Sequence, residues 1–120
     1  MSRDSLNDLN ARLLAFARER DWEQFHSPKN LSMALAGEAG ELLEHFQWRS
    51  FEESEAHCRN EDARQEIADE MADIAIYLTE MADNLGIDLL AAMASKLDKN
   101  AAKYPVEKAR GSHKKYSDLE

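Results

Sequence analysis

The sequence predicts an all-α, four-helix-bundle-like protein that forms a single domain over residues 1–120. Two observations carry this prediction. The chain contains only four glycines and two prolines, whereas alanine, leucine, glutamate and methionine, which favour helices, are abundant. Apolar residues also recur every three or four positions through long segments, as they do on one face of an α-helix.

Composition and charge argue against several functions. The formal net charge of −9 disfavours binding to polymeric nucleic acid, whose phosphates require a basic surface. It leaves room for a small phosphorylated ligand beside a metal ion and a few lysines. The single cysteine, Cys58, indicates a reducing cytoplasm. No apolar run reaches the length of a membrane span, and residues 1–10 lack the core of a signal peptide.

The first helix is expected from Ser5 to about Glu19. Ser5 and Asp8 form a weak capping box at its start. One face of this helix carries Leu6, Leu9, Leu13 and Phe16.

The connection over residues 21–30 is unusually aromatic for a solvent-exposed loop, because it contains Trp22 and Phe25. These rings either seal the end of the bundle or provide a wall on which a nucleobase stacks. Pro28 suits the first turn of the helix that follows.

The second helix, expected to run to about Trp48, carries acidic residues on its apolar side. Its apolar stripe consists of Leu31, Leu35, Leu42 and Phe46. At about 100° per residue, Glu38 falls inside this stripe and Glu41 lies on its flank.

The third helix repeats the pattern between a predicted cap at Asn60 and a predicted end at Gly86. Its apolar stripe consists of Ile67, Met71, Ile74, Leu78, Met81 and Leu85. Glu70 lies within the stripe and Asp73 on its edge.

Each of these two helices therefore offers an acid-x-x-acid pair that points inward or nearly so. Residues three apart are neighbours on a helix surface, so each pair can hold one ion. A carboxylate that faces a helical core is costly unless it is paired, protonated or bound to a cation, and Mg²⁺ accepts such oxygen ligands. The alternative interpretation is that these acids are solvated residues at the boundary between the apolar and polar faces of two amphipathic helices. Their repetition on two helices favours the metal.

Residues 49–59 are polar and are expected to form an exposed connection or a short, loosely held turn. A fourth helix is expected from about Leu89 to Tyr104, with Asp88 as its N-cap. This helix is expected to bury Leu90, Met93, Leu97 and Tyr104.

A basic strip lies beside the apolar face of the fourth helix. Lys96, Asn100 and Lys103 follow one another at helical spacing. They are either solvated lysines that favour a helix C-terminus or a phosphate-binding strip. Residues 105–120 lack a helical period and are expected to form a polar tail, either mobile or laid along another subunit.

The acid pairs resemble the metal-binding signature of the all-α nucleoside triphosphate pyrophosphatases, the MazG-like superfamily. Longer segments are similar to its dCTP pyrophosphatase branch, and the similarity covers nearly the whole chain from Arg18 onward. These segments are Arg20-Asp-Trp-Glu-Gln-Phe-His26, Pro28-Lys-Asn-Leu31, Gly37-Glu-Ala-Gly-Glu-Leu42, Phe46-Gln-Trp48, Ile76-Tyr-Leu78, Ser95-Lys-Leu-Asp-Lys-Asn100, Lys103-Tyr-Pro105, Arg110-Gly-Ser112 and Lys115-Tyr116. The stretch from Phe51 to Asp69 is variable, and no functional role is assigned to its residues from the resemblance.

This resemblance implies a MazG-type fold completed by oligomerisation into a tetramer or dimer, and hydrolysis of dCTP to dCMP and pyrophosphate in a nucleotide-pool clearing role. The implied metal is Mg²⁺, with Mn²⁺ as a substitute. Its implied ligands, which are also the catalytic residues, are Glu38, Glu41, Glu70 and Asp73. The implied substrate-binding residues are Trp22 and Trp48 around the pyrimidine, Tyr77 near the sugar or base, Lys96, Asn100, Lys103 and Tyr104 at the phosphates, and His26, Lys29 and Asn30 at the pocket mouth.

Several alternatives remain open from the sequence. The base that accepts the proton of water is Glu41 or, with lower rank because it points away from the stripe, Glu44. A pyrophosphatase with a broader or different nucleotide preference is the closest alternative function. A non-catalytic metal-binding helical module is disfavoured by the inward acids. A ferritin-like di-iron site requires Glu-x-x-His on two helices, whereas His45 follows Glu41 by four residues.

Overall fold

The computed structural model describes residues 5–119, and every regular element within that range is helical, as predicted. The chain divides into two compact units between Gly86 and Ile87. The first unit contains α1 (Leu6–Glu19), the 3₁₀ turn η1 (Glu23–Phe25), α2 (Pro28–Glu44), α3 (Phe51–Arg59) and α4 (Glu61–Leu85). The second contains α5 (Leu89–Lys103), α6 (Val106–Ala109) and the 3₁₀ turn η2 (Tyr116–Asp118).

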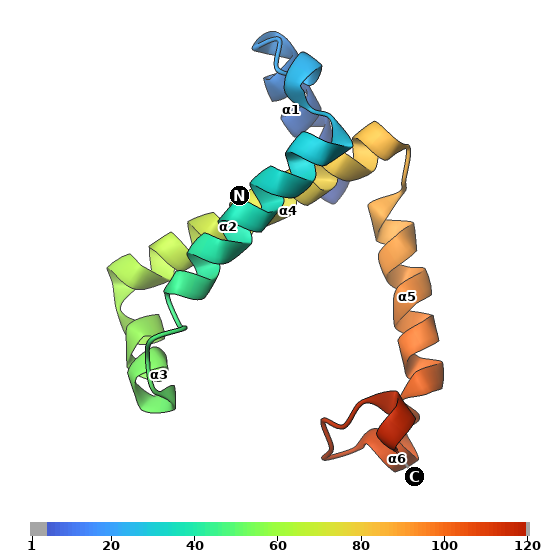
Figure 1. Ribbon diagram of the computed structural model, residues 1–120. Coiled ribbons are helices and arrows are strands. Elements are labelled where there is room, and N and C mark those ends of the chain that lie inside the picture. The colour runs from blue at the N-terminus through green and yellow to red at the C-terminus, as the bar shows by residue number, and fades with distance from the viewer. Residues whose placement is uncertain (1–4, 120) are drawn as a thin grey trace. The chain divides into compact units, whose positions relative to one another are not determined.

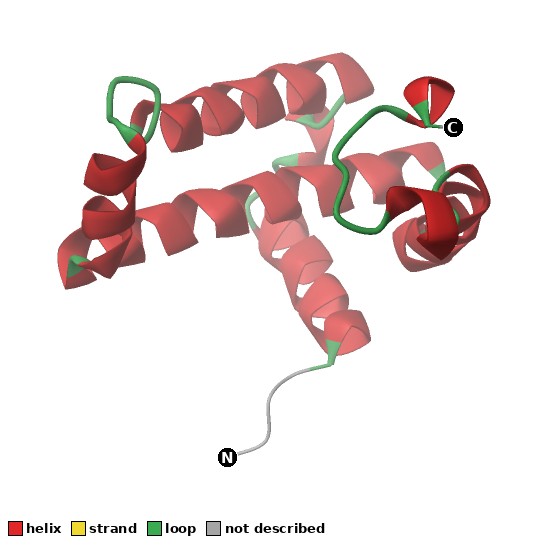
Figure 2. Cartoon of the chain, turned by 90° about the horizontal axis from the view of Figure 1, so that it is seen from below, coloured by secondary structure: helices red, strands yellow, loops and turns green. Residues whose placement is uncertain are grey.

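The pairing of α2 with α4 forms the centre of the first unit. The two helices lie side by side, and α1 and α3 each contact α4 as well (Figures 1 and 2). Leu31 of α2 is the largest fully buried side chain of the described residues. The other buried apolar residues include the small side chains of Ala17 and Ala82. The buried apolar residues within the described range are thus few, and most of them are alanines.

The predicted helix ends are confirmed where a local cap specifies them. Ser5 and Asp8 form the capping box of α1. The Asn60 side chain accepts a hydrogen bond from the N–H of Ala63 at 3.0 Å, which caps the start of α4. Gly86 ends α4 with a φ of 69°, a backbone conformation that favours glycine.

Two predictions about connections are wrong. The second helix ends at Glu44 rather than near Trp48, and a nine-residue helix, α3, replaces the expected loose connection. Ser50 accepts a hydrogen bond from the N–H of Glu53, whose carboxylate in turn accepts one from the N–H of Ser50. This capping box starts α3 and is visible in the sequence as Ser-x-x-Glu.

The expected polar tail over residues 105–120, whose last residue lies outside the described range, also contains short helical turns. Val106 to Ala109 form α6 directly after Pro105, which is well suited to a helix start. The N–H of Tyr116 donates a hydrogen bond to the Tyr104 hydroxyl at 3.2 Å, so the tail folds back on the end of α5.

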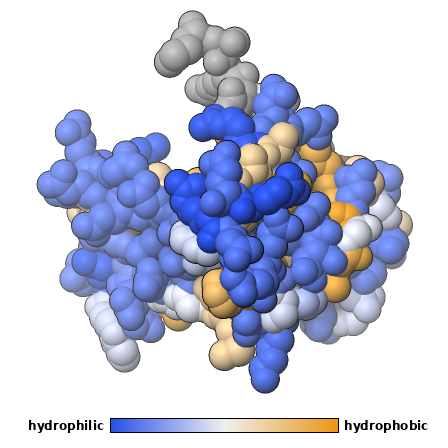
Figure 3. Space-filling model, turned by 90° about the horizontal axis from the view of Figure 1, so that it is seen from above, coloured by the Kyte–Doolittle hydropathy of each residue, from blue (hydrophilic) through white to orange (hydrophobic). Residues whose placement is uncertain are grey.

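The second unit does not by itself bury the apolar face of the fourth helix, contrary to the prediction. Leu90, Met93 and Leu97 of α5 are 47%, 59% and 70% exposed. Only Tyr104 of the predicted set is partly buried. The hydropathy surface in Figure 3 shows hydrophobic residues exposed in patches among hydrophilic ones. Such an uncovered apolar face is typical of a surface that another chain covers.

Within residues 5–119, no helix combines the length and the apolar character that a lipid bilayer span requires.

Candidate active site on α2 and α4

The four predicted metal ligands lie in one region, where α2 and α4 pack together. Glu38 and Glu41 project from α2, and Glu70 and Asp73 project from α4. Burial raises the pKa of Glu38, and the negative charges of Glu41, Asp73 and Glu70 raise it further. Each of the other three acids is therefore close enough to Glu38 to disfavour its ionisation.

Glu38 also has an unsatisfied oxygen. Its Oε2 atom is buried, and no hydrogen-bond donor within residues 5–119 reaches it. A buried carboxylate oxygen without a donor is costly, and three neighbouring carboxylates increase that cost. This arrangement is unfavourable for stability alone and suits an oxygen-coordinated cation.

A histidine lies close to one of these acids, Glu70, whose buried Oε2 atom still has no hydrogen-bond donor within residues 5–119. The Nε2 atom of His45, which follows α2, lies 2.8 Å from Oε2 of Glu70, and both side chains are largely buried. The Nδ1 atom of the same ring lies 2.8 Å from Nε2 of His57 on α3. Within the described residues no three His, Cys, Asp or Glu side chains are positioned together to hold a metal ion. The metal role of the four acids therefore stays a prediction.

These groups line a cavity of about 310 Å³ at the α3 end of the helix pair. The guanidinium of Arg49 donates a hydrogen bond to the backbone carbonyl of His45, which closes the turn after α2. Burial lowers the pKa of His57, and the nearby Arg49 and His45 lower it further. The residues around the cavity are Glu41, Glu44, His45, Arg49, His57, Glu66 and Glu70.

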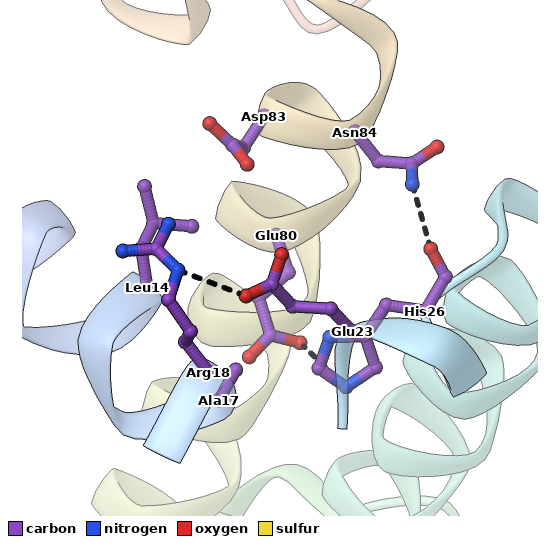
Figure 4. A pocket seen from close by; sticks show the side chains of 8 residues that line it. All are labelled: Leu14, Ala17, Arg18, Glu23, His26, Glu80, Asp83 and Asn84. Carbon is purple, nitrogen blue, oxygen red and sulfur yellow. Dashed lines mark hydrogen bonds and ion pairs between the residues drawn. The ribbon is translucent and has the colours of Figure 1, made fainter. Parts of the chain in front are cut away.

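A second cavity, of about 120 Å³, lies where α1, η1 and α4 meet. Figure 4 shows Glu80 of α4 pointing toward the ring of His26, with Oε2 of Glu80 3.7 Å from Nε2 of His26. Asn84 donates a hydrogen bond to the His26 carbonyl at 2.7 Å, and Arg18 pairs with Glu23 at 3.0 Å. Burial raises the pKa of Glu80, and the nearby His26 lowers it in part.

Tyr77 lies on α4, between Asp73 and Glu80 in the sequence. Burial raises the pKa of its hydroxyl, followed by the charges of Glu38 and Asp73 and then that of Glu80. The phenol is therefore close enough to Glu38, Asp73 and Glu80 for their charges to act on it. This position agrees with the predicted place of Tyr77 next to a substrate, without testing it.

The predicted aromatic walls differ in their contacts. Trp22 packs edge-on against Phe16 of α1, with ring centroids 5.6 Å apart, and remains 44% exposed. This contact supports the interpretation that Trp22 seals the bundle end, while leaving part of the ring accessible. Trp48, in the turn after α2, is 86% exposed.

The remaining predicted residues near α2 lie at its start. Lys29 and Asn30 are exposed in the first turn. The Asn30 side chain donates a hydrogen bond to the Phe25 carbonyl at 3.0 Å, and its backbone N–H donates to the Ser27 hydroxyl. Asn30 thus fixes the path of η1 into α2.

Three of the predicted phosphate-binding residues lie on α5 in the second unit, and the fourth, Tyr104, is the C-cap residue of that helix. Lys96 is exposed, and Asn100 and Tyr104 are partly buried. The ammonium group of Lys103 lies over the Tyr116 ring, 4.7 Å from its centroid. The strip is thus formed as the helical spacing predicts, and its role at the phosphates stays a prediction.

Sequence reasoning missed His57 and Glu80, and considered His45 only as a ligand of a di-iron site. Glu80 falls seven residues after Asp73, which places both on the same side of a helix. His57 belongs to α3, which the Ser50–Glu53 capping box could have revealed. No local pattern indicates that these side chains meet partners 12 or more residues away.

Comparisons with known proteins agree with this architecture. A model of the MazG-like family matches residues 34–119. The dCTP pyrophosphatase 1 of Rattus norvegicus is 45% identical over 115 residues, which cover 96% of this chain and 68% of the rat protein. The Homo sapiens protein of the same name is 43% identical over 115 residues, with the same coverage of 96% and 68%. A crystal structure of a pyrophosphatase from Archaeoglobus fulgidus DSM 4304 superposes with a TM-score of 0.78 at 36% identity, covering 88% of this chain and 96% of that one.

Proposed function

This chain belongs to the MazG-like family, and from that membership we propose that it hydrolyses dCTP between the α and β phosphates to dCMP and pyrophosphate. The relatives named dCTP pyrophosphatase 1 support the substrate and the reaction class. The observation that carries the proposal is the acid cluster, in which Glu41, Asp73 and Glu70 all act on the partly buried Glu38. The proposed cellular role of the enzyme is to remove excess or modified deoxycytidine triphosphates.

The acid cluster fits a hard divalent cation, for which we propose Mg²⁺, with Mn²⁺ as a substitute. The residues that would hold it are Glu38, Glu41, Glu70 and Asp73, all with oxygen donors. The buried Oε2 of Glu38, which lacks a donor within the described residues, supports this choice. When bound, such an ion would supply Lewis-acid stabilisation of the phosphoryl oxygens.

The chain's own residues would then handle the proton and the substrate. Glu41 is exposed and borders the larger cavity, so we rank it first as the group that takes the proton of the attacking water. Glu44 lines the same cavity and ranks second. Tyr77, which lies beside the acids, would close the wall next to the sugar or base.

The two proposed base-stacking rings require more than one chain. α2 contains 17 residues and separates the turns that carry Trp22 and Trp48 by roughly 25 Å, at 1.5 Å per residue. We therefore expect the second ring at each pyrimidine to come from another copy, in a homotetramer or homodimer. The exposed Trp48 and the uncovered face of α5 support this expectation.

The phosphate end would use the strip on α5. Lys96, Asn100, Lys103 and Tyr104 would bind the triphosphate, whose charge an otherwise acidic protein repels. His26, Lys29 and Asn30 would form the pocket mouth around η1. The lone free Cys58 supports a reducing compartment, the cytoplasm.

A product assay tests the proposal. Purified protein with Mg²⁺ is incubated with each natural dNTP and NTP, and the phosphate products are separated by ion chromatography. We expect dCMP and pyrophosphate, with dCTP as the preferred substrate. Orthophosphate as the first product would contradict cleavage between the α and β phosphates. Equal rates on all bases would leave the reaction class intact and replace the dCTP preference with the broader alternative.

A further inference from the structure

The Trp22 turn, residues 21–26, is attached to α4 by an asparagine. Asn84, in the last turn of α4, donates a hydrogen bond from its side-chain amide to the backbone carbonyl of His26 at 2.7 Å. Figure 4 shows the Asn84 side chain pointing to that carbonyl. The two residues are 58 positions apart in the sequence, so the bond links the end of α4 to the connection between α1 and α2.

Other hydrogen bonds of this connection are local. The Gln24 amide donates to the carbonyl of Asp21 at 2.9 Å and to its carboxylate at 3.0 Å. The Asn30 amide donates to the Phe25 carbonyl at 3.0 Å. These bonds join residues at most five positions apart, so they shape the turn and its entry into α2 but do not attach it to α4.

The backbone of the Trp22 turn leaves the helical conformation on both sides of the tryptophan. Asp21 has a φ of 55°, a left-handed conformation that a residue with a side chain adopts only where its surroundings hold it. His26 has a φ of −91° and a ψ of 62°, where the chain changes direction before Ser27, the N-cap of α2. Trp22 lies between these two positions, so the place of its ring depends on both. The bond to the His26 carbonyl restricts the second of them.

We propose that Asn84 is a positioning residue that holds the Trp22 turn in the conformation that receives the nucleobase. This inference rests on the proposed stacking of the pyrimidine on Trp22. If the turn also adopts other conformations, only a fraction of the protein is ready to bind dCTP, and the apparent affinity falls by that fraction. Asn84 lies 11 residues after Asp73 on α4, or roughly 16 Å at 1.5 Å per residue, so the acid cluster stays unchanged when Asn84 is replaced.

The first measurement is the KM and kcat for dCTP. Asn84→Ala should raise KM by about 3- to 10-fold, as expected for the loss of one hydrogen bond, and change kcat by less than about twofold. Asn84→Asp should raise KM at least as much, because a carboxylate cannot donate to a carbonyl. Asn84→His should return KM toward the wild-type value, because Nδ1–H of the imidazole stands as far along the side chain as the asparagine amide nitrogen.

The matched control is Gln65→Ala. Gln65 is another exposed amide of α4, and it donates to the Asp69 carboxylate at 2.9 Å within the same helix. Its loss should leave KM and kcat for dCTP unchanged, because it does not touch the Trp22 turn.

The second measurement needs no nucleotide. The chain has two tryptophans, so in a Trp48→Phe background the fluorescence reports on Trp22 alone. Asn84→Ala in this background should raise the constant for quenching by acrylamide, because a released turn exposes more of the ring. Asn84→His should quench like the parent.

The outcomes separate this inference from a structural role and from the proposed function. The inference is wrong if folded Asn84→Ala keeps the wild-type KM, if it loses kcat as strongly as it gains KM, or if Asn84→His is as impaired as Asn84→Ala. Circular dichroism shows whether each variant folds. If Asn84→Ala does not fold, a lower KM in Asn84→His than in Asn84→Asp supports the inference, and equal values overturn it. A wild-type protein that does not cleave dCTP would refute the proposed function, whereas the quenching measurement still shows whether Asn84 holds the turn.

Discussion

Two histidine–glutamate pairs lie along α4 in contrasting surroundings. Glu70 meets His45 at 2.8 Å, whereas Glu80, ten residues further along, faces His26 at 3.7 Å. At 1.5 Å per residue the two glutamates lie roughly 15 Å apart. Both histidines come from the segments that flank α2, one before it and one after it.

The difference lies in what surrounds each pair. Glu70 belongs to a cluster of acids, and its histidine is held by a second one. Glu80 is more buried, at 8% exposure, and no other acid contributes to its raised pKa. A buried carboxylate is costly in both places, but only a cluster of several acids can be compensated by a shared cation. Burial alone therefore does not identify the site.

The largest expected effect is a difference in catalytic activity between variants of Glu70 and of Glu80. Glu70→Gln should reduce the rate of dCTP hydrolysis by about 100-fold or more, as expected when a group that stabilises phosphoryl transfer is lost. Glu80→Gln should retain activity close to the wild type, because Glu80 is not part of the acid cluster. Pyrophosphate release at saturating Mg²⁺ measures both. Equal losses in the two variants would erase the proposed distinction.

Substitution of the tryptophans that flank α2 should have an intermediate effect, mainly on the KM for dCTP. Trp48→Ala should raise the KM for dCTP by about 10-fold and change kcat less, since stacking on a base contributes roughly 1–3 kcal/mol and acts in ground and transition states alike. Trp22→Ala should also lower the thermal midpoint, because its ring packs against Phe16. A Trp48→Ala enzyme with an unchanged KM would remove Trp48 from the substrate site.

The Glu80 pair should govern stability and its pH dependence. Because burial raises its pKa above the usual 4.5, protonation of Glu80 favours the folded state. This stabilising effect is complete below pH 4.5 and is lost as the pH rises through the folded-state pKa. Glu80→Gln should therefore raise the free energy of unfolding at pH 7 by about 1 kcal/mol, the cost of an unsatisfied buried polar group. In urea titrations the gain should shrink toward pH 4, and a gain independent of pH would contradict this cause.

The smallest effect concerns the support of the Glu70 pair from α3. Ser50→Ala removes the hydroxyl that accepts a hydrogen bond from the N–H of Glu53, and should lower the free energy of unfolding by about 1 kcal/mol. Because α3 carries His57, which lines the same cavity as Glu41 and Glu70, Mn²⁺ affinity should fall slightly in the same variant. Ser5→Ala, which removes the equivalent cap from α1, should cost similar stability and leave Mn²⁺ affinity unchanged. If the two variants affect metal binding equally, α3 has no special link to the site.

Sequence alone determined the elements and the acid pairs, because both depend on residues a few positions apart. Caps such as Ser5 and Asn60 act on the N–H groups of the next turn, and a spacing of three or four residues fixes which side chains share a face. The stripe positions of Glu38 and Glu70 follow from the same periodicity. These local rules also contained the start of α3, in the overlooked Ser50–Glu53 pair.

Only the tertiary structure decided what each face meets. His45 and Glu70 are 25 residues apart in the sequence, and they meet because α2 packs along α4. The burial of Glu80 against His26 depends on the same pairing. The apolar face of α5 was recognisable from its spacing, but its exposure was not, because periodicity defines a face without supplying the surface that covers it.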